Sequence, residues 1–126
     1  ARGILPKALP YFDAIKSVNS AACVVAAIFS GEYDRLRDAG GDFLHEPYRL
    51  PLIPGAKNAI EAGVAAGALT GWLSGSGSSV LCVARPARAA KVGRAMAAAF
   101  AAHTVPATIH PLFADNRGLR VLKRRA

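Results

Sequence analysis

Cysteine, acidic residues and long apolar runs are scarce in this chain, and each scarcity excludes a class of protein. The 126 residues include 2 cysteines. Cys23 and Cys82 stand alone rather than in a C-x-x-C pair, so neither a disulfide scaffold nor a zinc site is expected. The apolar run 21–29 is too short to span a bilayer, and no signal peptide is evident. These features predict a cytoplasmic protein with no membrane partner.

Acidic side chains are outnumbered by basic ones, 8 against 16, and the formal net charge is +8. A basic surface attracts anions, which include nucleic acids, acidic lipids and small phosphate-bearing molecules. Aromatic residues make up only 7% of the chain and do not interleave with the basic ones, as a binder of single-stranded nucleic acid would need. Four basic residues fall on one face of a predicted helix, which favours a solvated face: Arg85, Arg88, Lys91 and Arg94. A basic nucleic-acid-binding module stays as an alternative.

Hydrophobic residues make up 52% of the sequence, enough for one folded domain with a modest core. Their periodicity predicts helices over 13–30, 32–39, 42–47, 56–66 and 87–103. Strands are predicted on both sides of a Gly/Ser-rich segment at 74–79, over 104–113 and over 119–123. Helices come first and strands later, so we expect an α+β fold with a mostly antiparallel sheet.

The same periodicity predicts which side chains face the core. Asp13 is expected to cap the first long helix and Asp42 a short one. Tyr48 and Arg49 are expected on a stiff, irregular segment, because prolines flank them. The residues expected to point inward are Ile15, Val18, Ala22, Val25, Phe29, Tyr33, Leu36, Ile60, Val64, Ala89, Val92, Met96 and Phe100.

The segment 74–79, S-G-S-G-S-S, is the most informative motif. Gly75 and Gly77 let backbone N–H groups approach an anion closely, and the serines add hydroxyl donors. A Walker A loop is excluded because no Lys follows the glycines, and a dinucleotide fingerprint is excluded because no helix follows. A flexible hairpin loop is the alternative to an anion-binding one.

Residues 73–80, L-S-G-S-G-S-S-V, resemble the third conserved motif of the GHMP small-molecule kinases, L-S-G-S-G-P-[ST]-V, with Ser78 in place of the usual proline. Residues 45–49 and 51–55, H-E-P-Y-R and P-L-I-P-G, resemble the segment L-H-Q-P-Y-R-x-P-L-I-P-G of homoserine kinases. The start, A-R-G-I-L-P, and the segment 118–121, G-L-R-V, are also similar to that family. The resemblance follows the family order over nearly the whole chain.

This resemblance implies a GHMP kinase C-terminal domain spanning 1–126, with an antiparallel sheet and helices in a ferredoxin-like plait whose first strand lies before Ala1. Nothing here is similar to the family's ATP loop, so the N-terminal ATP-binding domain is expected to be absent. The implied activity is transfer of the ATP γ-phosphate to the hydroxyl of L-homoserine, a step of threonine biosynthesis. The implied substrates are homoserine and ATP, and ATP and Mg²⁺ are expected to be bound mainly by the missing N-terminal domain. The implied protein partners are that domain and a second copy of the chain in a homodimer. The chain alone is expected to be inactive. The C-terminal domain of a GHMP kinase for another alcohol is the alternative.

The resemblance also implies site residues. Arg2 and Arg49 match arginines that contact homoserine, and a guanidinium grips a carboxylate with two parallel hydrogen bonds; a surface arginine is the alternative in each case. Gly75, Ser76, Gly77 and Ser78 would support the phosphate loop of the missing domain. No catalytic residue is assigned. No metal ligand is assigned either, because His103 and His110 lack Cys or carboxylate partners at ligand spacing.

Three further positions are expected to have other roles. His45 could exchange protons near neutral pH, but its position beside Pro47 favours a bond to the backbone that holds the turn. Ser17 and Ser20 stand where the family has an asparagine and an arginine, so those contacts are not carried over.

Overall fold

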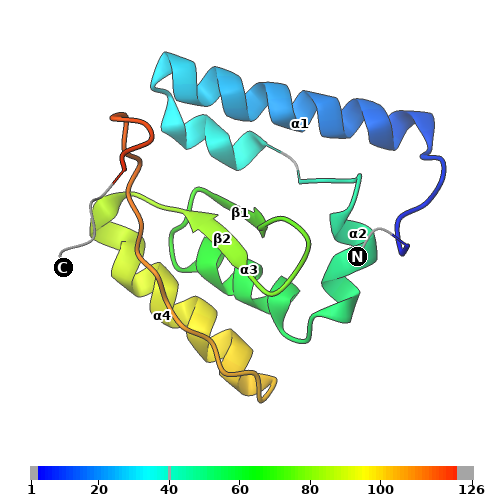
Figure 1. Ribbon diagram of the computed structural model, residues 1–126. Coiled ribbons are helices and arrows are strands. Elements are labelled where there is room, and N and C mark those ends of the chain that lie inside the picture. Colours follow the sequence, from blue (N-terminus) through cyan, green and yellow to red (C-terminus); the bar gives the residue numbers. More distant parts are fainter. Residues whose placement is uncertain (1–2, 40, 122–126) are drawn as a thin grey trace.

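A computed structural model of the chain describes residues 3–39 and 41–121. In chain order its elements are α1 (Tyr11–Ser30), the 3-10 helix η1 (Tyr33–Asp38), α2 (Glu46–Arg49), the 3-10 helix η2 (Leu50–Leu52), α3 (Ala56–Ala65), β1 (Thr70–Leu73), β2 (Val80–Val83) and α4 (Pro86–Ala102). Figure 1 shows α3 beside both the hairpin and α4, with α1 and η1 along another side of the molecule.

β1 and β2 form an antiparallel hairpin in which Thr70 pairs with Val83 and Leu73 with Val80. The predicted strand–loop–strand unit and the α+β class are therefore confirmed. The register leaves residues 74–79 as the connection between the strands, and we call this segment the Gly/Ser loop.

Small side chains build the core and let its elements approach closely. Ala56 and Ala59 of α3 are fully buried against Phe100 of α4, and Ala66 and Ala68 pack with Val92. The inward face predicted for α4 is confirmed, because Val92 and Phe100 are both buried. Leu69 completes the core on the other side, where it packs with residues of α1 and η1.

The inward face predicted for α1 is wrong. Val18 and Val25 are exposed, and Phe29 is 90% exposed, whereas Ser17 and Ala27 are buried. The helix is apolar on more than one side, and the side with small residues packs against η1 and the hairpin because it permits a close approach. Periodicity alone does not say which apolar side finds a partner.

The ends of α1 also differ from the prediction. The helix starts at Tyr11, after Pro10, and Asp13 makes no side-chain cap; instead it pairs with Lys16 at 3.7 Å. Gly31 ends the helix as predicted, in the left-handed conformation with φ 73°.

Helix α1, with 20 residues, is long and apolar enough to cross a membrane by length and composition alone. Its most apolar stretch of 18 residues has a mean hydropathy of 1.5, and 11% of that stretch is buried. The apolar run 21–29 is only part of this helix, which was predicted over 13–30. A single helix of this kind is weak evidence for a membrane, because both the buried core helices of soluble proteins and signal sequences pass the same test.

Two other residues expected in the core lie at the surface. Val64 is 41% exposed and Tyr33 is 44% exposed. The guanidinium carbon of Arg85 lies 5.9 Å from the centre of the Tyr33 ring, and Arg85 also pairs with Asp34 at 2.9 Å. The ring therefore supports a cation at the surface instead of filling the core. Leu36, on the same 3-10 helix, is buried as predicted.

The strands predicted over 104–113 and 119–123 are wrong wherever the structure describes them, since 104–113 and 119–121 have no strand conformation. Pro106 and Pro111 remove two backbone donors from the first segment. In the described part of the chain the sheet is the β1–β2 pair alone, and a strand forms only with a partner edge. Residues 122–123 lie outside the described residues.

Candidate functional site

The Gly/Ser loop has a defined backbone. The N–H of Ser74 donates to the carbonyl of Ser79 at 2.9 Å, which closes the loop at its base. Gly75 has φ 66° and Ser78 has φ 47°. Around Ser78 the N–H of Ser79 donates to the carbonyl of Gly77 at 2.7 Å, which makes a tight three-residue turn. Ser76 and Ser78 are exposed, so their hydroxyls are open to solvent.

The backbone conformation of Ser78 is one that the proline of the family motif could not adopt. A proline has φ fixed near −65°, which is incompatible with the positive φ at Ser78. The tight turn therefore requires a residue other than proline here. A non-glycine residue at positive φ carries strain, so this loop depends on its surroundings to keep its shape.

Arg49 lies at the end of α2 and contacts the loop. Its Nη1 donates to the carbonyl of Gly75 at 3.0 Å, and its buried Nε finds no hydrogen-bond partner among the described residues. The segment is not irregular, as the sequence had suggested, but helical, with Pro47 in its first turn. Proline is compatible with that position because the first helical N–H groups lack partners anyway. The structure thus brings Arg49 and Gly75, both predicted from sequence, into contact.

Asp42 fixes the start of α2. Its carboxylate accepts from the N–H groups of His45 at 2.7 Å, Glu46 at 2.8 Å and Leu44 at 3.2 Å. Burial raises the pKa of Asp42, but these hydrogen bonds outweigh it and hold the pKa below its ordinary value. Asp42 therefore stabilises the turn that leads into α2, but the predicted cap of a helix over 42–47 is wrong, because α2 begins at Glu46, its N-cap is His45, and no side chain caps it.

Glu46 is a site residue that the sequence analysis missed. Its Oε1 accepts from the backbone N–H of Leu73, the last residue of β1, and only 9% of Glu46 is exposed. Its place at the start of a short helix looks like an ordinary surface acid. The one signal was the departure from the resembling segment, which has glutamine at this position.

His45 does not hold the turn through its ring as expected. The ring Nδ1 is buried without a partner in the described part of the chain, and Nε2 lies 3.8 Å from Asp42. The backbone N–H of His45, rather than its ring, makes the hydrogen bond that stabilises the turn.

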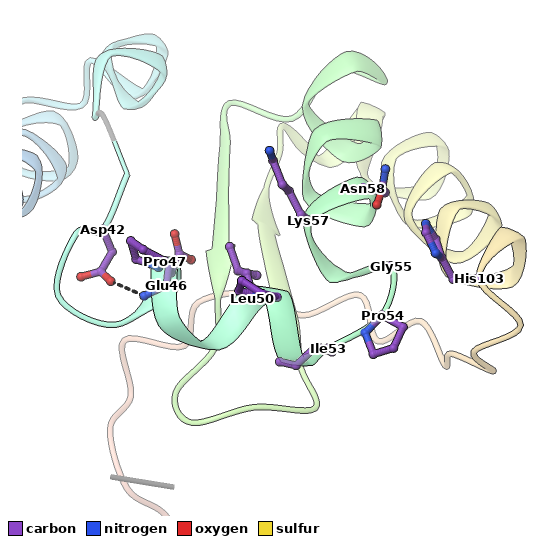
Figure 2. Close-up of a pocket in the computed structure, with 11 residues that line it drawn as sticks. Asp42, Glu46, Pro47, Leu50, Ile53, Pro54, Gly55, Lys57, Asn58 and His103 are labelled. Carbon is purple, nitrogen blue, oxygen red and sulfur yellow. Dashed lines mark hydrogen bonds between the residues drawn. The ribbon is translucent and has the colours of Figure 1, made fainter. Parts of the chain in front are cut away.

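A cavity with a volume of about 600 Å³ lies on the side of α2 and η2 that faces α3 and the end of α4 (Figure 2). Asp42 and Glu46 lie at one end, His103 at the other, and Lys57 projects from α3. Leu50 and Ile53 contribute apolar walls, and the other lining residues are Pro47, Pro51, Pro54, Gly55 and Asn58. Neither Arg49 nor the Gly/Ser loop lines it. Glu46 is the residue common to the cavity and the loop contact.

The remaining predicted residues add little to the site. Arg2 lies outside the described residues. In residues 3–39 and 41–121 no group of three or more His, Cys, Asp or Glu side chains could hold a metal ion. Cys82 is half-buried and donates weakly to the carbonyl of Ile60, while Cys23 is exposed. Burial raises the pKa of Cys82 to about 11, so this thiol is not a nucleophile near neutral pH.

The matching family model is described as GHMP kinases C terminal and covers residues 24–102. The chain belongs to this family, as the sequence motifs had predicted. A homoserine kinase from Moorella thermoacetica is 43% identical over 97% of this chain and 41% of that protein. A homoserine kinase from Thermus thermophilus is 42% identical over 78% of this chain and 34% of that protein.

A solved structure agrees with these sequence relatives. The crystal structure of homoserine kinase from Cytophaga hutchinsonii superimposes with a TM-score of 0.75 at 32% identity, over 80% of this chain and 32% of that one. The fold is therefore that of the family. The chain spans about two fifths of the length of the curated relatives it matches.

Proposed function

We propose that this chain is the C-terminal, substrate-side domain of a homoserine kinase, which transfers the ATP γ-phosphate to the hydroxyl of L-homoserine in threonine biosynthesis. The structural observation that carries the proposal is the hydrogen bond from Arg49 Nη1 to the Gly75 carbonyl. It joins the two motifs that resemble this family, although 26 residues separate them in sequence. The relatives named homoserine kinase cover nearly the whole chain and support the same assignment.

Arg49 is proposed to bind the carboxylate of homoserine. Nη1 is engaged by Gly75, while the buried Nε has no partner among the described residues. A buried donor without a partner is costly. Since Nε has almost no open surface in this structure, the proposal requires the Arg49 side chain to shift when homoserine binds, so that the substrate carboxylate satisfies Nε with a charge-assisted hydrogen bond. Arg2 is proposed to assist from the N-terminal segment on the strength of the resemblance alone.

Phosphoryl transfer depends mainly on positioning and on neutralising charge. In this proposal the Gly/Ser loop, with Gly75, Ser76, Gly77 and Ser78, supports the ATP loop of an N-terminal domain. ATP and Mg²⁺ are bound mainly by that domain. The described residues contain no cluster of three or more His, Cys, Asp or Glu side chains that could hold a metal ion.

Exposed apolar side chains on α1 fit a chain that packs against further protein. Tyr11 is 75% exposed, Phe12 72% and Phe29 90%. The N-terminal domain of the same enzyme and a second copy in a homodimer are the proposed partners for such surfaces. A cytoplasmic location follows from the proposed biosynthetic role, and nucleic acid has no part in it.

The test compares this chain alone with the full-length protein that carries it. With homoserine and Mg-ATP, a coupled assay is expected to show turnover for the full-length protein and none above background for the chain alone. Turnover by the chain alone would contradict the domain assignment. Phosphorylation of another small alcohol in preference to homoserine would keep the family but replace the substrate.

A further inference from the structure

Helix α2 contacts the β1–β2 hairpin at two points, through side chains one turn apart. Glu46 accepts a hydrogen bond from the N–H of Leu73, where β1 ends, and Arg49 donates to the carbonyl of Gly75 at 3.0 Å. Residues at i and i+3 share one face of a helix. One face of α2 therefore holds both Leu73, which precedes the Gly/Ser loop and which we call its root, and Gly75, the second residue of the loop.

The Glu46 carboxylate makes its loop contact from a buried position, with 9% of the residue exposed. Taking a carboxylate out of water is unfavourable unless hydrogen bonds compensate. The main chain of Glu46 is fixed by Asp42, which accepts from its N–H at 2.8 Å. Asp42 thus sets α2, and α2 sets the distance over which the carboxylate must reach Leu73.

The loop needs such external support. Ser78 has φ 47°, which is strained for a residue other than glycine, whereas Gly75 takes its positive φ without strain. The loop's own backbone contributes the hydrogen bonds from Ser74 to Ser79 and from Ser79 to Gly77. A strained segment persists only where the surrounding structure over-determines it. The two contacts from α2 reach Leu73 and Gly75 and not Ser78, so they constrain the side of the loop that follows β1.

We propose that Glu46 is a positioning residue: it holds the root of the Gly/Ser loop by the reach of its carboxylate oxygen to Leu73, and so places Gly75 against Arg49. The requirement is for an acceptor at this distance and not for a negative charge. The kinetic consequence rests on the proposed function, because loop position affects the rate only if the loop lies near the transferred phosphate.

Two substitutions separate reach from charge. Glu46→Gln keeps the length and the acceptor oxygen but loses the charge, whereas Glu46→Asp keeps the charge and shortens the reach. In the full-length enzyme, E46Q is expected to keep kcat within about threefold of wild type. E46D is expected to lower kcat about tenfold and to speed amide exchange of segment 70–79 about tenfold, the effect of losing one buried hydrogen bond. The KM for ATP is expected to stay the same in both.

A Val92→Ala variant is the control for general destabilisation. Val92 is 3% exposed and packs with Ala66 and Ala68, in a cluster that contains no residue of α2 or of the loop. At a temperature where this variant is folded, its kcat and the relative protection of segment 70–79 should match wild type.

The proposal is overturned if E46D keeps normal rate and protection while E46Q loses them, because charge would then be the requirement. It is also overturned if V92A lowers kcat as much as E46D does. Absence of homoserine phosphorylation in the wild-type enzyme would instead defeat the proposed function. The exchange comparison of E46Q with E46D would still decide whether Glu46 holds the loop.

Discussion

Arg49 and Gly75 are joined by a hydrogen bond of 3.0 Å from a guanidinium Nη1 to a backbone carbonyl. One partner comes from a helical turn braced by Pro47 and the other from the loop between β1 and β2. The contact places a cation beside a loop that has exposed hydroxyls and glycine backbone. A carboxylate bound by Arg49 would therefore lie close to this loop.

Ser78 is expected to tolerate glycine and reject proline. Its φ of 47° is unfavourable for serine, free for glycine and closed to proline. Ser78→Gly should change the free energy of unfolding by less than about 1 kcal/mol. Ser78→Pro should lower it by about 2–3 kcal/mol or remodel the loop. Denaturant titration of both variants checks this, and a fully stable Ser78→Pro protein would contradict the tight turn.

Replacing Gly71 with alanine is expected to destabilise the protein, although it adds only a methyl group. A Cβ at this position would lie 2.6 Å from Cys82 Sγ and 2.9 Å from the carbonyl oxygen of Leu81, and the backbone atom cannot move cheaply. Gly71→Ala should lower the free energy of unfolding by about 1–3 kcal/mol. Gly3→Ala is the matched control, because nothing lies within 4 Å of its Cβ. Equal stability of the two variants in urea would show that the close approach is not real.

The two cysteines should differ in reactivity. Cys23 is exposed, whereas burial raises the pKa of Cys82 to about 11. The thiolate is the reacting species, so Cys82 stays protonated at mildly alkaline pH. An alkylating reagent should modify the native protein once, at Cys23, and twice after unfolding. Mass spectrometry of the labelled peptides reads this directly, and rapid labelling of native Cys82 would be the contrary result.

Asp42 should make the free energy of unfolding depend on pH in the acidic range. Its pKa is lowered in the folded protein because its backbone hydrogen bonds outweigh the opposing effect of burial. The stabilisation is therefore complete above the unfolded pKa of about 3.9 and is lost as the pH falls through the lower folded value. Asp42→Asn keeps an acceptor but does not titrate.

The stability difference between wild type and Asp42→Asn should favour wild type near neutral pH and shrink as the pH approaches about 3. Urea titrations across this range measure it. A difference that does not change with pH would mean that the Asp42 carboxylate is not held by α2.

Local signals in the sequence were enough to predict the hairpin and the ends of several helices, whereas the Arg49 segment was expected to be irregular and is helical. Gly31 acts at short range, through its left-handed backbone conformation, so the sequence predicts the end of α1 correctly. The orientation of α1 could not be predicted, because Phe29 and Ala27 are both apolar and only the partner surface selects between them. The strand expected over 104–113 failed for a related reason, since β structure depends on an edge contributed from elsewhere.

The candidate site likewise combines residues that the sequence could predict with one that it could not. The resemblance pointed to Arg49 and Gly75, but no local sequence pattern predicts that Glu46 contacts Leu73, 27 residues further along the chain. Such a contact depends on how α2 docks on the hairpin. An acidic residue in a short, proline-containing turn has no pattern that separates a buried acceptor from a solvated surface charge.

The most direct test of the account measures kcat/KM of the full-length enzyme and its Arg49→Ala variant with two alcohols. One is homoserine, and the other is the amino alcohol that has homoserine's hydroxyl and amine but no carboxylate. Removing a desolvated contact to a carboxylate costs about 2–5 kcal/mol, which is roughly thirtyfold or more in kcat/KM. Arg49→Lys should recover part of the loss, since it keeps the charge but not the planar fork.

The account predicts that Arg49→Ala lowers kcat/KM for homoserine by this amount, leaves the affinity for ATP nearly unchanged, and has little effect on the weak reaction of the alcohol that lacks a carboxylate. An equal loss with both alcohols, or near-normal homoserine kinetics in the folded variant, would contradict the assignment of Arg49 to the substrate carboxylate.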